Sequence, residues 1–241
     1  MRVAVVGGSG GIGAALIAKL EASSEVSVVH ATYNRTPQKA HTTPANDKPK
    51  TRWSQLDATD ERAVEDWVTG LDAVDWFINC VGFLHTEKYR PEKKIRQFDS
   101  ALFQQSMRVN CLPTLLIAKY AHSNLKQSDK AVFATVSARV GSIEDNRLGG
   151  WHSYRASKSA LNMALKCIAI EWQRTLPQVR VLSLHPGTTD TALSEPFQQG
   201  VSEGKLFSCA KTAGFLLEHI RCAHEHESGR FIAWDGSPIP W

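Results

Sequence analysis

The stretch "RVAVVGGSGGIGAALIAKL", residues 2 to 20, decides the fold of this chain of 241 residues. In it a β-branched apolar run, a glycine-rich turn and a segment of helical period follow one another directly. Glycines in such a turn let the backbone approach a pyrophosphate, whose charge is then met by amides at the N-terminus of the helix. We therefore expect a dinucleotide site, with a glycine-rich turn that binds nothing as the alternative. The residues of the expected site are Gly7, Ser9, Gly11, Ile12 and Gly13.

Short apolar runs alternate with longer segments of helical period over the rest of the chain. The expected strands are 2–7, 26–33, 53–57, 74–82, 130–137, 179–185 and 230–234. The expected helices are 11–22, 59–69, 98–125, 151–175 and 211–224. This alternation favours an α/β fold in which helices cover both faces of a parallel sheet. The polar, proline-containing stretch 34–52 breaks both periodicities, so we expect an exposed insertion there and not a linker between domains.

Composition and charge argue against several classes of protein. The chain has 42% hydrophobic and 22% charged residues and a net charge of +4, which favours an ordinary globular protein and is too small to indicate nucleic-acid binding. No apolar run approaches the length of a membrane span, so neither export nor membrane insertion is expected. The five cysteines are scattered without a Cys-x-x-Cys pair, as expected for a cytoplasmic protein. The run "CAHEHE" at 222–227 fits no common zinc spacing, so no metal site is expected.

The glycine loop also contains Gly-x-Ser-x-Gly, which raises a serine hydrolase with Ser9 as nucleophile as an alternative. In that arrangement one oxyanion amide comes from a loop that precedes the nucleophile in the chain. Only eight residues precede Ser9, so the sequence favours the dinucleotide site.

The choice of dinucleotide is expected near the end of the second strand, where an NAD site places a carboxylate. No Asp or Glu occurs between Glu25 and Asp47, and Asn34 and Arg35 stand at the expected position. Because Arg35 is available to meet a 2'-phosphate, the sequence favours NADP, with NAD as the alternative.

Five further segments occur in order along the chain. They are "INCVG" (78–82), "RVN" ending at Asn110, "TVSARVGS" (135–142), Tyr154-x-x-x-Lys158 and "HPGTTDT" (185–191). Together with the glycine loop they make the chain resemble a classical short-chain dehydrogenase/reductase from end to end. The runs "SARVGSIEDNRLGGWHSYRASKSALNM" and "WDGSPIPW" resemble the C-factor-like branch of that family, which is named for a bacterial cell-cell signal.

The resemblance implies a fold and an assembly. It implies a single-domain Rossmann fold over residues 1–241, in which a doubly wound, seven-stranded parallel sheet has the order 3-2-1-4-5-6-7 and carries helices on both faces. The substrate loop would lie at about 187–210. The family also implies a homodimer or homotetramer formed through the helices expected at 98–125 and 151–175.

The resemblance implies roles for individual residues as well. Tyr154 would be the general acid/base, and Ser137 would hydrogen-bond the substrate oxygen. Lys158 would bind the nicotinamide ribose and favour the tyrosinate, and Asn110 would hold a water of a proton relay beside a kink that Pro113 helps to form. The remaining cofactor contacts implied by the family are Asp57 at the adenine, Asn79 and Gly82 at the adenosine ribose, and Pro186, Gly187, Thr189 and Thr191 around the nicotinamide.

A tyrosine and a lysine four residues apart suit carbonyl chemistry. Carbonyl reduction delivers a hydride to carbon and a proton to oxygen, so it needs a cofactor and a positioned acid. Bringing the pKa of a tyrosine from about 10 to near 7 requires about 4 kcal/mol. An ammonium about 4 Å away at an effective dielectric of about 20 supplies a similar amount. Residues four apart share a face of any helix, so an aromatic ring over a surface lysine is the alternative.

The sequence thus predicts an NADP-preferring oxidoreductase that acts on a small or medium carbonyl or alcohol. A C-factor-like signalling or interaction protein that binds a dinucleotide without turnover is the alternative. We expect 191–207 and 85–94 to select the substrate, and the residues of an apolar lid are Leu193, Pro196, Phe197 and Phe207.

Other histidines and tryptophans compete for roles around this site. His152 and His185 flank it, and structural roles are expected for both because an imidazole offers a donor and an acceptor. Trp151, Trp172 and Trp241 are expected in packing or at an interface.

Overall fold

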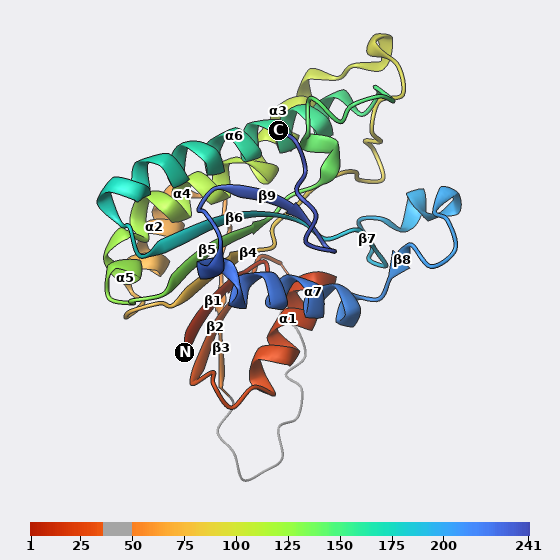
Figure 1. Ribbon diagram of the computed structural model, residues 1–241. Coiled ribbons are helices and arrows are strands. Elements are labelled where there is room, and N and C mark those ends of the chain that lie inside the picture. Colours follow the sequence, from red (N-terminus) through yellow and green to blue (C-terminus); the bar gives the residue numbers. More distant parts are fainter. Residues whose placement is uncertain (36–49) are drawn as a thin grey trace.

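The computed structural model describes residues 1–35 and 50–241, which form a parallel sheet with helices on both faces (Figure 1). The strands are β1 (Arg2–Val6), β2 (Val28–Tyr33), β3 (Thr51–Gln55), β4 (Trp76–Asn79), β5 (Ala131–Val136), β6 (Val179–His185) and β9 (Arg230–Ala233). Their order in the described chain is β3-β2-β1-β4-β5-β6-β9, and adjacent strands pair in parallel. Because β9 is the seventh strand of this sheet, the expected order 3-2-1-4-5-6-7 is confirmed.

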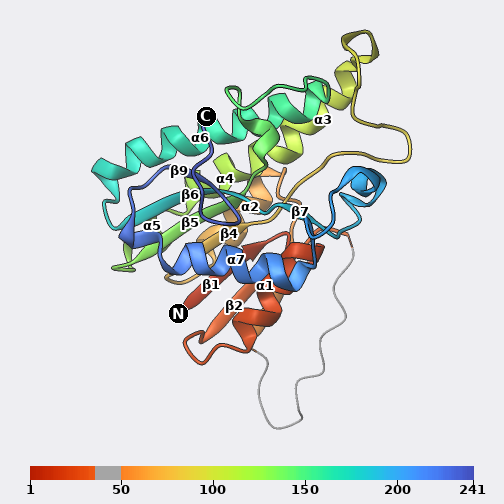
Figure 2. The same ribbon diagram turned by 45° about the vertical axis from the view of Figure 1, so that its right-hand side comes forward.

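The apolar runs form strands because both faces of the sheet are covered. In β1, Val3 and Val5 belong to the core on one face, whereas Ala4 and Val6 belong to the core on the other. The seven helices of the described residues are α1 (Gly11–Glu21), α2 (Glu61–Thr69), α3 (Ser100–Asn110), α4 (Leu112–Tyr120), α5 (His122–Lys126), α6 (His152–Thr175) and α7 (Cys209–Arg221). Helices α1 and α7 cover one face, and α2, α4 and α6 cover the other (Figures 1 and 2).

The long helix expected at 98–125 is interrupted in the structure. It consists of α3, α4 and α5, with breaks at Cys111 and Ala121. Pro113 lies in the first turn of α4, where its missing N–H costs no hydrogen bond, and it leaves the carbonyl of Val109 without its helical donor. The break at Cys111 therefore has the cause that the sequence indicates.

The insertion expected at 34–52 ends earlier than predicted, before residue 51. Thr51 and Arg52 already belong to β3, which starts two residues before the predicted strand and ends at Gln55. Residues 36–49 of the expected insertion lie outside the described residues. Two elements of two residues were not predicted, because they are too short to show a period: β7 (Thr188–Thr189) and β8 (Leu206–Phe207), which pair in parallel.

Two segments extend beyond the carboxyl ends of the strands in both views (Figures 1 and 2). One joins β4 to α3 and contains the 3₁₀ helix η1 (Ile95–Gln97), and the other joins β7 to β8 and contains η3 (Glu195–Gly200). In open parallel sheets ligands bind at the carboxyl ends, where the strand order reverses, here between β1 and β4. These two segments therefore stand beside the expected site.

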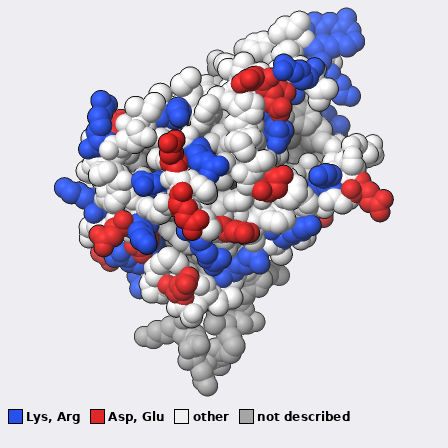
Figure 3. Space-filling view, viewed as in Figure 1, with Lys and Arg blue, Asp and Glu red and all other residues white. Residues whose placement is uncertain are grey.

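Charges of both signs are interspersed on the face of the molecule shown in Figure 3. Basic side chains gather at its upper right, where the segment between β4 and α3 carries the exposed Lys93, Lys94 and Arg96. Within the described ranges, no helix combines the length and the apolar character that crossing a membrane requires.

Candidate active site

A cavity of about 480 Å³ opens at the carboxyl ends of the central strands. Its walls come from the turn after β1, the turn after β4, the end of β5, the start of α6 and the chain that follows β6. The lining residues are Gly10–Gly13, Cys80–Gly82, Leu84, Val136–Val140, Trp151, Tyr154, Lys158, His185–Thr189, Thr191–Ser194, Phe197 and Val201. The expected dinucleotide loop and the expected Tyr–Lys pair thus share one cavity.

The glycine loop forms a wall of backbone with very little space for side chains. A Cβ at Gly13 would lie 2.4 Å from the carbonyl oxygen of Gly7, and Gly7 itself has a left-handed φ of +77°. Helix α1 starts after Gly10, has no side-chain cap and has no acidic residue in its first turn. Its first amides therefore open into the cavity, and this cradle fits a phosphate.

Not every residue expected in the cofactor site lines the cavity. Gly11, Ile12, Gly13, Gly82, Pro186, Gly187, Thr189 and Thr191 do. Gly7 and Ser9 belong to the turn but do not line the cavity. The amide of Gly7 donates to the Thr32 hydroxyl at 3.1 Å. In the described part of the chain no hydrogen bond joins Ser9 to a histidine, so the serine hydrolase has no catalytic base there.

Asn79 differs from the expectation that it contacts a ribose. Its side chain is buried, donates to the Thr114 hydroxyl at 2.9 Å and accepts from the amide of Val81 at 3.0 Å. Because both ends of the amide group are used inside the protein, Asn79 fixes the turn that carries Cys80–Gly82 and does not face the cavity.

Asn34, Arg35 and Asp57 lie outside the cavity, after the carboxyl ends of β2 and β3, and all three are exposed. The Asp57 carboxylate accepts from the amide and the hydroxyl of Thr59 at 2.9 and 2.7 Å. Hydrogen bonding from Thr59 lowers the pKa of Asp57, and the positive charges of Arg108 and Arg35 act in the same direction. The edge of the site where an adenosine is expected thus combines Arg35 with one anionic carboxylate.

Tyr154 and Lys158 lie on the buried face of α6, so the surface alternative for this pair is wrong. The ammonium of Lys158 lies 5.9 Å from the centroid of the Tyr154 ring and donates to the carbonyl of Val136 at 3.0 Å. Since successive turns of α6 bring both side chains to the end of β5, the lysine is anchored by the strand and the tyrosine faces the cavity.

Burial controls the protonation of this pair more than their mutual contact does. It raises the pKa of Tyr154 well above its usual value and lowers the pKa of Lys158 to about 8. Burial therefore opposes the lowering of the tyrosine pKa that we expect from Lys158, because desolvation disfavours both charged forms and the lysine bonds to Val136. A protonated tyrosine is the form that donates a proton to a carbonyl oxygen.

Ser137 is held by a residue that sequence reasoning missed. Its hydroxyl donates to Oδ1 of Asn162 at 2.7 Å, and the same oxygen accepts from the Ser183 hydroxyl at 2.9 Å. The Nδ2 of Asn162 is buried without a partner in the described residues. Asn162 follows Lys158 by four residues, and this helical spacing was the signal that would have found it.

Asn110 occupies the end of α3 but its side chain does not reach the cavity. Its Oδ1 accepts from the amide of Phe83 at 2.7 Å, and its Nδ2 donates to the Phe83 carbonyl at 2.8 Å and to the Ser157 hydroxyl at 2.9 Å. The side chain is fully used in holding the turn after β4 against α6. A water relay at this residue would need its main-chain carbonyl.

The histidines have different environments. His185 lines the cavity, and burial together with the charge of Arg139 lowers its pKa to about 4, so the imidazole is neutral at neutral pH. His152 does not line the cavity. His224 bonds through Nε2 to the carbonyl of Ala131 at 3.2 Å. Across residues 1–35 and 50–241 no group of His, Cys, Asp and Glu is arranged to hold a metal.

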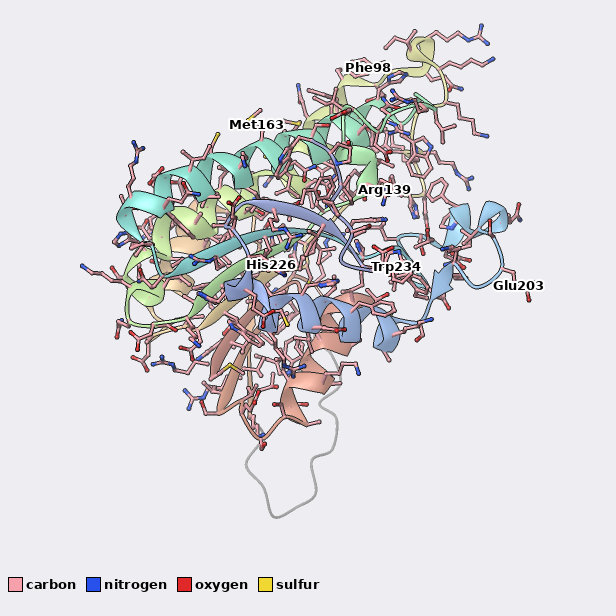
Figure 4. All side chains as sticks on the ribbon, viewed as in Figure 1. Phe98, Arg139, Met163, Glu203, His226 and Trp234 are labelled. Carbon is pink, nitrogen blue, oxygen red and sulfur yellow. The ribbon has the colours of Figure 1, made fainter. Side chains whose placement is uncertain are left out.

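The apolar lid contains only part of the predicted set. Leu193 and Phe197 line the cavity, whereas Phe207 packs on Trp234 with 4.7 Å between ring centroids and Pro196 does not line the wall. Trp151 packs edge to face on Tyr154 and Phe197, and it also lines the cavity. In Figure 4, Arg139 and Trp234 lie on the side where the strands end, and Glu203 lies at the tip of the segment between β7 and β8.

The comparisons agree with this geometry. The sequence matches the family described as short chain dehydrogenase over residues 1–202. A 1-hydroxy-2-glutathionyl-2-methyl-3-butene dehydrogenase of Rhodococcus sp. (strain AD45) is 28% identical over 188 residues, covering 77% of this chain and 78% of that protein. C-signal of Myxococcus xanthus is 32% identical over 143 residues, covering 59% of this chain and 81% of that protein. NADPH-bound carbonyl reductase from chicken fatty liver is similar in structure, with a TM-score of 0.82 and 22% identity over 100% of this chain and 94% of that one.

A parallel sheet of this order, with an open helix N-terminus at its carboxyl edge, is typical of a dinucleotide-binding fold. The match over residues 1–202 shows that the chain belongs to the short-chain dehydrogenase family. It is accordingly an enzyme that acts on CH–OH or C=O groups. The similarity to the C-factor-like branch rests on the C-signal protein and covers part of the chain.

Proposed function

We propose that this enzyme is an NADP-preferring carbonyl reductase in which Tyr154 protonates the substrate oxygen. The observation that carries the proposal is that Ser137, Tyr154 and Lys158 line the same cavity as the open N-terminus of α1. The raised pKa of Tyr154 supports the reducing direction, because it keeps the proton on the phenol until a carbonyl oxygen develops negative charge.

Each residue of the site has a separate role at the substrate carbonyl. When bound, the nicotinamide dinucleotide supplies the hydride for the carbonyl carbon. Tyr154 supplies the proton for the oxygen, and the Ser137 hydroxyl, once turned from Oδ1 of Asn162 toward the substrate, donates a hydrogen bond that orients that oxygen. Lys158, held by the Val136 carbonyl, presents its remaining N–H groups to the ribose of the cofactor and stabilises the tyrosinate left after proton transfer.

Consumption of NADPH with a panel of ketones and aldehydes tests this function. The Tyr154→Phe variant should lose about 10²- to 10⁴-fold in kcat, the usual contribution of a general acid. Tyr120→Phe is the matched control, because that hydroxyl bonds to Glu61 at the exposed end of α4. Equal activity of Tyr154→Phe and wild type would show that another group delivers the proton.

Arg35 supports the preference for NADP. It follows β2, and no Asp or Glu occurs between Glu25 and Asp47 to favour a free ribose hydroxyl. We expect Arg35→Glu to raise the KM for NADPH at least about tenfold and to leave that for NADH nearly unchanged, as loss of a charge-assisted hydrogen bond requires. Arg221→Glu, an exposed residue at the end of α7, controls for the change in net charge. An unchanged preference for NADPH over NADH in Arg35→Glu would show that another residue recognises the 2'-phosphate.

A signalling or interaction protein that binds a dinucleotide without turnover is the second candidate, and its support is the similarity to C-signal. The two candidates differ in what Tyr154→Phe does. In a binding protein this variant would keep both dinucleotide affinity and biological effect, whereas in the enzyme it keeps only the affinity.

The assembly that we propose is a homodimer or homotetramer formed through α4 and α6. Leu115 on α4 and Met163 and Ile170 on α6 are exposed apolar side chains on these helices. Light scattering after gel filtration measures the state directly, and Met163→Lys should shift it toward the monomer. A wild-type monomer at micromolar concentration would contradict the proposed assembly.

A further inference from the structure

Trp151, the residue before α6, has a backbone conformation that its side chain disfavours. Its φ of 50° and ψ of 43° lie in the left-handed region, and among the described residues it is the only non-glycine with a positive φ. Gly149 and Gly150 precede it with the same handedness. A bulky residue keeps this conformation only where its surroundings hold it, and such residues cluster at ligand sites.

Glu92 holds this turn from the segment between β4 and α3. Its side chain is only 2% exposed, and its carboxylate accepts from the amide of Ser153 at 3.2 Å and from the Ser153 hydroxyl. Its main-chain carbonyl accepts from the amide of Trp151. A buried carboxyl group that accepts from the first turn of a 24-residue helix caps its N-terminus, so the strained turn is held in one position.

The hydrogen bonds to Glu92 hold the indole of Trp151 in the cavity, between the ring of Tyr154 and the lid residue Phe197. The ring centroid lies 6.1 Å from that of Tyr154 and 5.0 Å from that of Phe197, and both contacts are edge to face. Phe197 is supported from behind by His85 at 5.6 Å, whose Nε2 lies 3.3 Å from the carbonyl of Ala192. Two segments far apart in sequence thus hold one pair of rings beside Tyr154.

The remaining walls near this pair are mostly apolar. Leu84, Val140, Leu193 and Val201 line the same space. Of the two basic residues in the lining, Arg139 is paired with Asp145 at 3.3 Å and Lys158 donates to the carbonyl of Val136. A substrate whose oxygen meets the Tyr154 hydroxyl has the indole beside it, because the Trp151 ring lies 6.1 Å from that of Tyr154, and the Phe197 ring packs on the same indole at 5.0 Å.

We propose that Trp151 and Phe197 form an aromatic pair that selects flat, conjugated carbonyl compounds, with aryl ketones as the simplest members, over saturated ones of equal size. The inference rests on the proposed function, since it takes Tyr154 to be the group that meets the carbonyl oxygen. A flat ring stacks on one face or meets one edge of each aromatic side chain at the usual separation of about 4.5–7 Å. A saturated ring is thicker and has no π-system to complement the two edges.

Acetophenone and cyclohexyl methyl ketone test this selection, because they share the carbonyl group and the number of carbons. Wild type should have the higher kcat/KM for acetophenone, although conjugation makes its carbonyl the less electrophilic one. Trp151→Leu and Phe197→Leu should each lower the ratio of the two kcat/KM values about tenfold, mainly through KM. Phe197 lies outside the strained turn, so Phe197→Leu still tests the selection if Trp151→Leu does not fold.

Phe98→Leu is the control for loss of an aromatic ring. Phe98 is 46% exposed, packs on Phe103 and does not line the cavity, so its variant should keep the wild-type ratio. An unchanged ratio in both Trp151→Leu and Phe197→Leu would overturn the aromatic pair while leaving the reductase intact.

Binding without turnover separates this inference from the proposed function. Ligand-observed NMR in the presence of NADPH compares benzamide with cyclohexanecarboxamide, whose amide carbonyls resist hydride reduction. Preferential binding of benzamide that is lost in Phe197→Leu would support the aromatic pair even if no ketone were reduced. Equal binding of both amides by wild type would contradict it.

Discussion

The cofactor half of the cavity is formed mainly by backbone, and the substrate half is formed mainly by side chains. The cofactor half is a backbone surface in which Gly13 packs against Gly7 and the amides of α1 face outward. The substrate half is a side-chain surface in which Trp151 and Phe197 come from segments that meet only in the folded protein. A Cβ added to the backbone surface at Gly11 or Gly13 would meet other atoms at 2.8 or 2.4 Å, whereas a side-chain surface can be changed one ring at a time without disturbing the sheet beneath it.

The largest effect that this contrast predicts belongs to Gly13→Ala. The added Cβ would lie 2.4 Å from a backbone oxygen, so the loop must shift and its amides lose their alignment. We expect the Kd for NADPH to rise at least about 100-fold, and the free energy of unfolding to fall by about 1–3 kcal/mol, as for other overpacked sites. Fluorescence titration of NADPH and urea unfolding measure the two quantities.

Gly214→Ala is the matched control for that variant. A Cβ at Gly214 on α7 meets only the end of the Lys19 side chain, at 3.8 Å. Replacement of an unstrained helical glycine by alanine should raise the free energy of unfolding by about 0.5–1 kcal/mol and leave NADPH binding unchanged. Wild-type affinity in Gly13→Ala would show that the loop is more compliant than its contacts indicate.

The second prediction concerns Asn162, which holds Ser137 where the cofactor half and the substrate half of the cavity meet. Asn162→Leu removes the acceptor that holds the Ser137 hydroxyl at 2.7 Å. Loss of one such bond, about 1.4 kcal/mol, should lower kcat about tenfold while the Kd for NADPH stays within about twofold of wild type. Ser183→Ala leaves the bond between Ser137 and Asn162 intact and should keep most of the activity. Parallel losses in both variants would mean that Asn162 acts through general packing and not through Ser137.

The same contrast explains how much of the molecule could be predicted from sequence. The order of the main sheet and the glycine loop follow from local patterns, because turn, helix start and strand period are encoded within about 20 residues. The Tyr154 and Lys158 pair is also local, being four residues apart on one helix. Glu92 contacts Ser153 across 61 positions, and no spacing rule connects them.

The side-chain partners of Asn79 and Asn110 and the burial of Tyr154 could not be predicted, and the reasons have one physical origin. Asn79 and Asn110 were expected at the ligand, yet both use their amides inside the protein, on Thr114 and on Phe83 and Ser157. Which partner a buried amide finds depends on packing between distant segments. The pKa of Tyr154 was expected to fall because of Lys158, but burial, which a sequence does not state, has the larger effect.

The smallest expected effect is the pH dependence of carbonyl reduction. Burial lowers the pKa of Lys158 to about 8, so the side chain is an ammonium below that pH and a neutral amine above it. Tyr154 stays protonated throughout, since burial raises its pKa. With Lys158 charged in the active form, kcat/KM should be level up to about pH 7 and fall about fourfold between pH 7 and 8.5.

Initial rates of NADPH consumption over pH 6 to about 10, at constant ionic strength, measure this alkaline limb. Whatever activity Lys158→Arg retains should show no such limb, because a guanidinium keeps its charge at all these pH values. A limb of the same midpoint in Lys158→Arg would assign the titration to another group. A rate of NADPH consumption that rises toward alkaline pH in wild type would contradict the role of a charged Lys158, because loss of the ammonium charge predicts a fall.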